Sequence, residues 1–163
     1  MNKETDLIKA VYGNKLRVRV CGIYIKDNKI LLMKHNNLGK TGTLWAPPGG
    51  GMEYGESATE ALKREFKEET NLTIAVEDFL FVHEYLDPPL HGIELFFKVK
   101  LVEGQPNLGY DPEISTTDQI LSELKFQDLK SLRNSDFESL HYVLQHSIDL
   151  KMLINQKGYF KFH

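Results

Sequence analysis

The alternation of hydrophobic and polar residues near the start of the chain indicates a β-hairpin. Residues 16–25 begin as an alternating pattern and then become continuously apolar, as expected of a strand that enters a core. Asp27-Asn28 is a turn dipeptide, and residues 29–35 have the composition of a returning strand. We therefore expect residues 16–35 to form a hairpin within a central sheet.

Further strands are indicated in the second half of the chain. Residues 78–86 and 93–101 are rich in aromatic and aliphatic side chains, and the proline-containing segment 87–92 turns the chain between them. Residues 103–117 are rich in Gly, Pro, Asn, Asp and Thr, which predicts a long loop of the kind that is often functional. Residues 119–126 predict a last short strand.

Helical spacing occurs in four segments, of which residues 57–71 give the clearest pattern. The others are residues 6–12, 127–132 and 135–148, the last of which begins with a capping-box sequence. A short edge strand is expected at residues 158–162. Hairpins packed against helices favour an α+β fold or an α-β-α sandwich.

The segment 57–71 carries its own start and stop signals. Ser57 and Glu60 form a capping box, in which each side chain satisfies a backbone N–H at the helix N-terminus. Asn71 is the usual substitute for glycine at the left-handed position that closes a helix. The segment therefore predicts a helix with defined ends.

Carboxylates lie on the apolar side of this helix. At about 100° per residue, Glu65 and Glu69 fall on the same arc as Phe66, and Glu68 lies at its edge. A carboxylate on a buried face is costly unless it meets a cation or hydrogen-bond donors, so this arrangement is typical of a functional site. The alternative is an ordinary surface helix on which Glu and Lys side chains pair.

Composition bounds the class of protein. The chain has 163 residues, of which 41% are hydrophobic and 26% charged, as in one soluble globular domain spanning residues 1–163. A net charge of −3 without a dense Lys/Arg block argues against a nucleic-acid partner. The single cysteine, Cys21, fits a buried thiol in a reducing compartment. With no signal peptide and no apolar run long enough to cross a membrane, we expect a cytoplasmic protein.

A glycine-rich loop precedes the helix that carries the carboxylates. Gly49, Gly50 and Gly51 permit backbone geometries that other residues resist, which lets the chain bend tightly. The spacing from Gly50 mimics a phosphate-binding P-loop, but Glu56 stands where that motif needs lysine. Clustered glutamates without a thiolate cluster instead favour Mg²⁺ or Mn²⁺ over Zn²⁺. The histidines show no ligand spacing, so we expect them at the surface or in the core.

One pattern of fixed spacings runs through residues 50–72. Its positions are Gly50, Glu56, Arg64-Glu65-Phe66, Glu68-Glu69 and Leu72. This pattern resembles the signature box of the Nudix hydrolases, with Asn71 where that family usually has Gly. The departure is mild because Asn tolerates the left-handed conformation. The resemblance implies a Nudix-like α-β-α sandwich with a central mixed β-sheet.

The resemblance also implies a role for each charged residue of the box. Glu68 and Glu69 are expected to bind Mg²⁺ or Mn²⁺, with Glu65 as a ligand or the general base. Glu56 is expected to be an outer ligand or a support, and Arg64 to orient the glutamates. A metal held by the glutamates would neutralise a diphosphate and lower the pKa of an attacking water.

The expected activity is hydrolysis of a pyrophosphate bond in a nucleoside diphosphate joined to another group. Nucleotide sugars, ADP-ribose, dinucleoside polyphosphates and nucleoside triphosphates remain open as small-molecule substrates. The alternative is a Nudix module that has lost catalysis and senses nucleotides, although the complete set of box carboxylates favours the enzyme. A homodimer is possible, because homodimers are frequent in such families.

Candidate contacts outside the box are few and individually weak. A distal general base could come from residues 110–113 or from Asp118. Candidate phosphate-binding cations are Arg17, Arg19, Lys34 and Lys40, and candidate base-stacking rings are Tyr54, Tyr85 and Trp45. Trp45 is more simply explained as a packing anchor.

Overall fold

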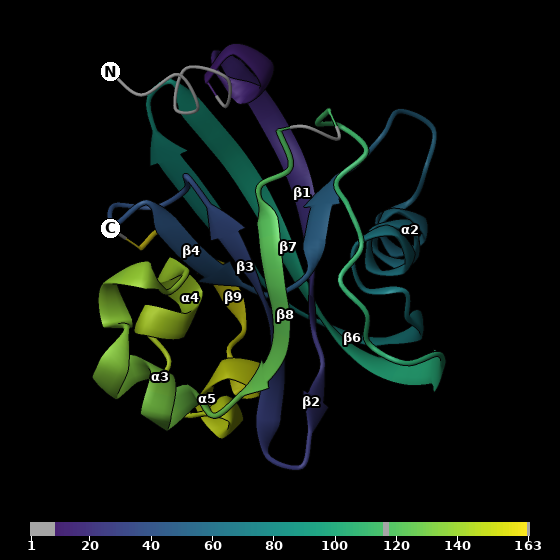
Figure 1. Ribbon diagram of the computed structural model, residues 1–163, viewed down its shortest axis with the longest axis vertical. Helices are drawn as coiled ribbons and strands as arrows, with labels where there is room; N and C mark the ends of the chain where they lie inside the picture. Colours follow the sequence, from purple (N-terminus) through teal and green to yellow (C-terminus); the bar gives the residue numbers. More distant parts are fainter. Residues whose placement is uncertain (1–8, 116–117, 163) are drawn as a thin grey trace.

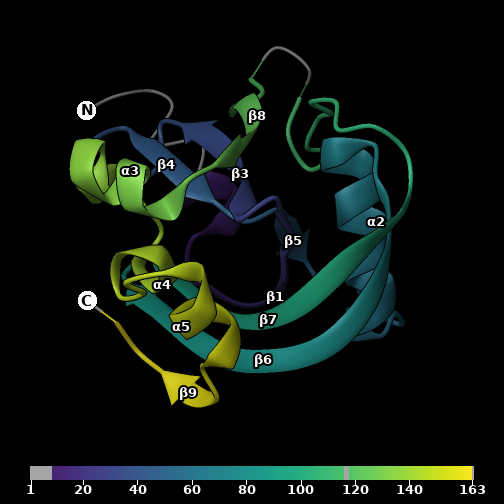
Figure 2. The ribbon, with the colours of Figure 1, turned by 90° about the horizontal axis from the view of Figure 1, so that it is seen from below.

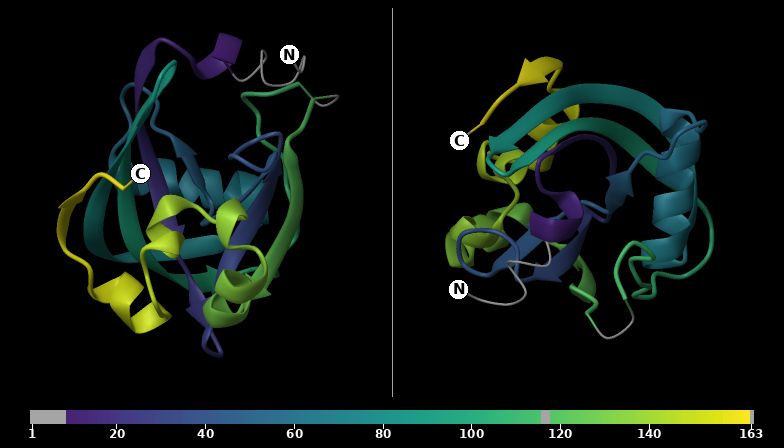
Figure 3. Two further views of the ribbon diagram at one scale, coloured as in Figure 1. Left: turned by 90° about the vertical axis from the view of Figure 1, so that its left-hand side faces the viewer. Right: turned by 90° about the horizontal axis from the view of Figure 1, so that it is seen from above.

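Two β-sheets form the centre of the structure, a computed structural model that describes residues 9–115 and 118–162 (Figure 1). The five-stranded sheet is mixed and has the order β5 (Gly49–Gly51), β1 (Lys15–Ile23), β7 (Leu90–Glu103), β6 (Thr73–Asp87), β9 (Gly158–Phe160). The second sheet contains β2 (Ile25–Lys26), β3 (Lys29–Asn36), β4 (Thr43–Ala46) and β8 (Leu121–Gln127), with β3 pairing all three others. Strands β6 and β7 curve strongly toward the second sheet (Figure 2, Figure 3).

The hairpin turn expected at Asp27-Asn28 is confirmed, since it joins β2 to β3. The expected pairing of the two long strands was wrong, because β1 and β3 lie in different sheets. Strand β1 pairs with β5 along one edge and runs parallel to β7 along the other, which leaves no edge for β3. The chain changes sheets at Tyr24, and only the short β2 pairs with β3. The strands expected at 78–86 and 93–101 are present and longer, as β6 and β7.

Helices cover the sheets on two sides. Helix α2 (Ala58–Thr70) packs through Leu62 and Phe66 against one core cluster. The second cluster lies under the C-terminal elements, which are α3 (Leu129–Ser135), the 3-10 helix η1 (Phe137–Ser139), α4 (Tyr142–Gln145) and α5 (Leu150–Asn155). Figure 2 shows α2 and these elements on opposite sides of the strands. The α+β class and sandwich-like layering are thus confirmed.

The ends of α2 lie where the sequence placed them. Ser57 is the N-cap, its hydroxyl accepts a hydrogen bond from the Glu60 N–H, and the Glu60 carboxylate accepts one from the Ser57 N–H. Asn71 closes the helix in the left-handed conformation, with φ of 59°. Cys21 and Trp45 are buried, and β9 is an edge strand, as expected.

The single helix expected over residues 135–148 was wrong. The chain is extended at Leu140, where it bridges Trp45, and the His141 N–H donates to the Trp45 carbonyl at 2.9 Å. This pairing interrupts helical hydrogen bonding and separates η1 from α4. Ile148, at the end of this segment, is 66% exposed.

Residues 9–12 are helical, and the remainder of the helix expected at 6–12 lies outside the described residues. No helix in the described ranges has the length and hydrophobicity that a membrane crossing requires.

Candidate active site

A cavity of about 460 Å³ opens beside the glycine-rich strand β5. Its wall includes backbone from Gly49, Gly50 and Gly51, side chains from β1 and β7, and parts of the segment around α4. Glu65 and Glu69 enter this wall from α2. The cavity therefore joins the predicted carboxylates to the inner face of the five-stranded sheet.

The glycines of β5 make room for the carboxylates of α2. A Cβ atom at Gly50 would lie 2.4 Å from the Glu65 carboxyl carbon, and one at Gly49 would lie 1.9 Å from the Val20 carbonyl oxygen. The Gly49 N–H donates a hydrogen bond to Glu69 Oε2 at 3.0 Å. Side chains at these positions would displace the carboxylates or the strand, so the glycine-rich loop is needed for close approach.

Arg64 is the centre of the carboxylate group. Its Nε and Nη2 donate to the two oxygens of Glu56 at 3.1 and 2.7 Å. Its Nη1 donates to Glu65 at 2.9 Å and to Glu68 at 3.2 Å, and Nη2 also reaches the Gly51 carbonyl. One planar guanidinium thus fixes three glutamates and ties α2 to β5.

The predicted ligands fall into two sets in this structure. Glu65 and Glu69, 6% and 4% exposed, line the cavity, as the apolar arc of the helix predicted. Glu56 and Glu68 join this pair through Arg64 and are not part of the cavity wall. Glu56, with both oxygens bound to Arg64, occupies the position of a support.

Burial sets the electrostatics of the inner pair. It raises the pKa of Glu65 to about 7, with a further increase from Glu68 and an opposing effect of Arg64. It also raises the pKa of Glu69 well above its usual value, and the neighbouring Glu65 adds to this. Hard carboxylate oxygens that are crowded and short of positive charge suit a divalent ion such as Mg²⁺. The residues therefore fit the metal that the sequence implied.

We expect Glu65→Gln to be more stable than the unaltered chain in EDTA, by an amount that grows with pH. Because the pKa of Glu65 is about 7 in the fold against a usual 4.5, the native state binds more protons between these values. The stability of the unaltered chain therefore falls as pH rises through this window, by up to about 3 kcal/mol from this group. Urea unfolding from pH 4.5 to 8 measures it, and equal stability at pH 8 would contradict it.

The long loop after β7 brings further acids to the cavity. The N–H groups of Asn107 and Gly109 donate to the carbonyls of Thr70 and Glu69, which caps the C-terminus of α2. Asp111 and Glu113 consequently lie in the cavity wall. Glu113 pairs with Arg17 at 3.0 Å. Both acids therefore stay candidates for a distal general base.

Four of the other proposed contacts do not line the cavity, and one of them, Trp45, is buried in a core cluster instead. Asp118, a third candidate base, accepts a hydrogen bond from Ser115 and is not among the wall residues. Lys34 pairs with Glu123, and Tyr54 is fully exposed. The candidates that do line the cavity are Arg17, Arg19, Lys40 and Tyr85.

A buried group of two histidines and a glutamate was missed in the sequence. His83 on β6, Glu94 on β7 and His141 before α4 place one ligand-type atom each within 4.8 Å of one another. Glu94 and His141 also line the cavity. No spacing joins these positions, because their contact depends on strand register and on the turn at Leu140.

Comparison with known proteins places the chain among relatives of one kind. A family model described as the NUDIX domain matches residues 14–143. The ADP-ribose pyrophosphatase of Methanocaldococcus jannaschii is 38% identical over 138 residues, which are 83% of this chain and 76% of that protein. Phosphatase NudJ of Shigella boydii is 28% identical over 120 residues, 72% of this chain and 77% of that protein.

Solved structures share the same fold. The MutT protein from Methanosarcina mazei superposes with a TM-score of 0.62 at 20% identity, covering 78% of this chain and 86% of that one. The MutT NUDIX hydrolase from Burkholderia pseudomallei gives a TM-score of 0.57 at 25% identity, covering 71% and 85%.

Proposed function

Because this chain belongs to the family defined by the NUDIX domain, we propose that it uses Mg²⁺ or Mn²⁺ to hydrolyse the pyrophosphate bond of a nucleoside diphosphate joined to a second group. The chain is a Nudix-type pyrophosphohydrolase, acting on phosphorus-containing acid anhydrides. The observation that carries the metal-dependent reaction is the buried pair Glu65 and Glu69, which shares one cavity with Arg17 and Arg19. Carboxylates and arginines in one cavity suit a diphosphate that is bridged to the protein through a metal ion.

The charged residues of the box have different roles in the proposed reaction. Glu65, Glu68 and Glu69 would hold the ion through carboxylate oxygens, and Arg64 fixes two of them in place. When bound, the ion neutralises the diphosphate and lowers the pKa of the attacking water. Arg17 and Arg19, in the wall of the same cavity, would bind phosphate oxygens through their guanidinium groups.

Glu65 and the two distal acids, Asp111 and Glu113, compete for the role of general base. Glu65 has a pKa near neutrality, because burial raises it to about 7, which suits proton transfer at physiological pH. Glu113, in the distal loop, lies in the same cavity wall. Glu65 is then either a ligand or the base, and Asp111 or Glu113 is the base if Glu65 binds the ion.

We place ADP-ribose first among the candidate substrates. The relative from Methanocaldococcus jannaschii carries the name ADP-ribose pyrophosphatase, and it matches most of this chain. The cavity volume of about 460 Å³ lies in the usual range for small-molecule sites. Nucleotide sugars, dinucleoside polyphosphates and nucleoside triphosphates complete the panel to be tested.

A hydrolysis screen tests the proposal. We expect phosphate-containing products from at least one of these four substrate classes with Mg²⁺ or Mn²⁺, none with EDTA, and recovery when Mg²⁺ is restored. Ion-exchange chromatography of the products identifies the bond that is cleaved. Tight binding of a nucleotide without hydrolysis in either metal would overturn the enzyme in favour of a nucleotide-sensing module.

A further inference from the structure

A row of side chains crosses the five-stranded sheet at the level of the cavity. Arg19 on β1 is in register with Gly51 on one side and with Glu94 on the other, and Glu94 is in register with His83. Neighbouring strands lie about 4.8 Å apart, so Glu94 is about 10 Å from the glycine strand that borders the metal-binding glutamates. This is the distance over which a phosphate and an attached sugar extend.

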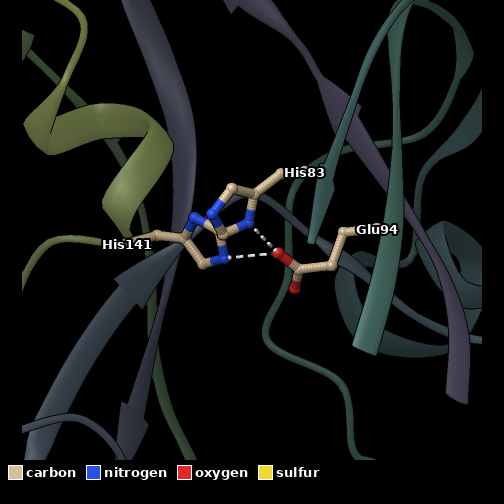
Figure 4. A group of neighbouring side chains, drawn as sticks. All are labelled: His83, Glu94 and His141. Carbon is tan, nitrogen blue, oxygen red and sulfur yellow. Dashed lines mark hydrogen bonds and ion pairs between the residues drawn. The ribbon is translucent and has the colours of Figure 1, made fainter. Parts of the chain in front are cut away.

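Two imidazoles hold one oxygen of Glu94. His83 Nδ1 lies 2.8 Å from Glu94 Oε2, and His141 Nε2 lies 3.0 Å from the same atom (Figure 4). His141 Nδ1 accepts a hydrogen bond from the Val143 N–H, so the ring proton is on Nε2 and is donated to Glu94. The arrangement thus directs one ring nitrogen of each histidine at the same oxygen of the carboxylate.

The pattern of partners favours a hydrogen-bonded group over a metal site. A metal-binding histidine donates its second ring N–H to an acceptor. Here Val143 presents a donor to His141, and His83 Nε2 is buried without a partner in the described part of the chain. A metal on Nε2 of His141 would therefore leave a protonated Nδ1 facing the Val143 N–H, and it would give the buried His83 Nε2 no partner.

The second oxygen of Glu94 remains for a ligand. Oε1 points away from both imidazoles (Figure 4), and Arg19 Nε lies 3.9 Å from it, beyond hydrogen-bond distance. Arg19 Nε is itself buried and unpaired among residues 9–115 and 118–162. Hydrogen bonds and charge interactions from His141 and His83 outweigh the effect of burial and hold the pKa of Glu94 well below its usual range. The wall thus presents an acceptor beside a donor.

We propose that Glu94, positioned by His83 and His141, binds hydroxyl groups of the sugar attached to the diphosphate, with Arg19 bridging this subsite and the phosphates. A hydroxyl group both donates and accepts, so it matches a carboxylate next to a guanidinium. A phosphate ester on the same sugar would meet the fixed negative charge and be rejected. This inference rests on the proposed function, because it assumes that the diphosphate lies at the glutamates.

The sharpest variant is Glu94→Gln. A glutamine can keep its carbonyl oxygen toward His83 and His141, which turns its NH₂ group toward the cavity and converts the acceptor there into a donor. Glu77→Gln, on the neighbouring strand β6 and paired with Lys98 and Lys100, is the matched control.

Binding is measured by NMR titration with ribose 5-phosphate and 2-deoxyribose 5-phosphate in saturating Mg²⁺. We expect the unaltered chain and Glu77→Gln to prefer ribose 5-phosphate by about tenfold, the size of one hydrogen bond to a charged group. Glu94→Gln should bind both compounds alike. For ADP-ribose hydrolysis, Glu94→Gln should raise KM by about tenfold with kcat nearly unchanged.

A second pair of variants tests the positioning role. His83→Asn keeps a donor near the place of Nδ1, whereas His83→Leu removes it. We expect His83→Leu to raise KM for ADP-ribose as Glu94→Gln does, and His83→Asn to restore much of the loss.

Other results would overturn the subsite. These are equal binding of the two sugar phosphates by the unaltered chain, a preference that survives in Glu94→Gln, or a fall in kcat with no change in KM. Stoichiometric Zn²⁺ binding that is lost in His83→Leu would replace it with a metal site. If the unaltered chain prefers ribose 5-phosphate but hydrolyses nothing, the proposed function fails and the subsite stands. If it hydrolyses a substrate but shows no such preference, the subsite fails and the proposed function stands.

Discussion

Glu68→Gln will lose hydrolysis of every substrate that the unaltered chain cleaves, by on the order of a thousandfold in kcat, since bound metal contributes several kcal/mol to such reactions. Glutamine has nearly the same shape but only one acceptor oxygen and no charge, so it would weaken metal binding. Glu68 and Glu65 accept hydrogen bonds from the same guanidinium nitrogen, Nη1 of Arg64. The fold should therefore survive while the metal-binding group loses a ligand.

The measurement is initial velocity at saturating substrate over a range of Mg²⁺ concentrations. Glu103→Gln, at the exposed end of β7, makes the same chemical change at a residue that is not part of the cavity wall or of the carboxylate group, and it should keep full activity. Full activity in Glu68→Gln would show that Glu68 is not a metal ligand and has no catalytic role. Recovery at high Mg²⁺ would mark it as a ligand that affects affinity alone.

Arg64→Lys will lower kcat by about a hundredfold, the size expected when catalytic groups move by about 1 Å. The guanidinium of Arg64 contacts Glu56, Glu65 and Glu68 at once, and a lysine ammonium cannot reproduce this planar set of donors. The variant should also lose about 2 kcal/mol of stability in EDTA, since lysine keeps the charge but cannot donate hydrogen bonds to all three carboxylates at once.

Two measurements separate these effects. Urea unfolding with and without Mg²⁺ gives the stability change, which Mg²⁺ should partly offset because the ion would bind carboxylate oxygens that have lost a hydrogen-bond donor. Lys63→Ala, on the solvent side of the same helix, serves as the control and should be nearly neutral. An Arg64→Lys variant with normal activity would show that Arg64 is only a surface cation of α2.

The sequence predicted the carboxylate-bearing helix well because its signals are local. Ser57, Glu60 and Asn71 act through hydrogen bonds and backbone angles within a turn of their own position, so neighbouring residues suffice to place the ends. The burial of Glu65 and Glu69 followed from helical periodicity, which holds wherever the helix packs. The family followed from the same stretch, since its spacings are fixed along the chain.

Local signals failed where distant strands decide the outcome. The hydrophobic pattern of residues 16–25 and 29–35 predicts a hairpin, yet β1 pairs along both of its edges with other strands, β5 and β7. Residues 135–148 have helical spacing, but the bridge between Leu140 and Trp45 stops the helix. In both places, pairing with a partner far along the chain outweighed the local preference.

The sequence by itself thus determined the family and the class of reaction. It also predicted a divalent ion and the glutamates that the structure places around Arg64. Only the tertiary structure decided which acids share a cavity with Glu65, since Asp111 and Glu113 reach it through a loop that caps α2. It also brought His83, Glu94 and His141 together. The physical reason is range: helix periodicity and capping act over a few residues, whereas strand register and loop packing join residues that no spacing in the sequence connects.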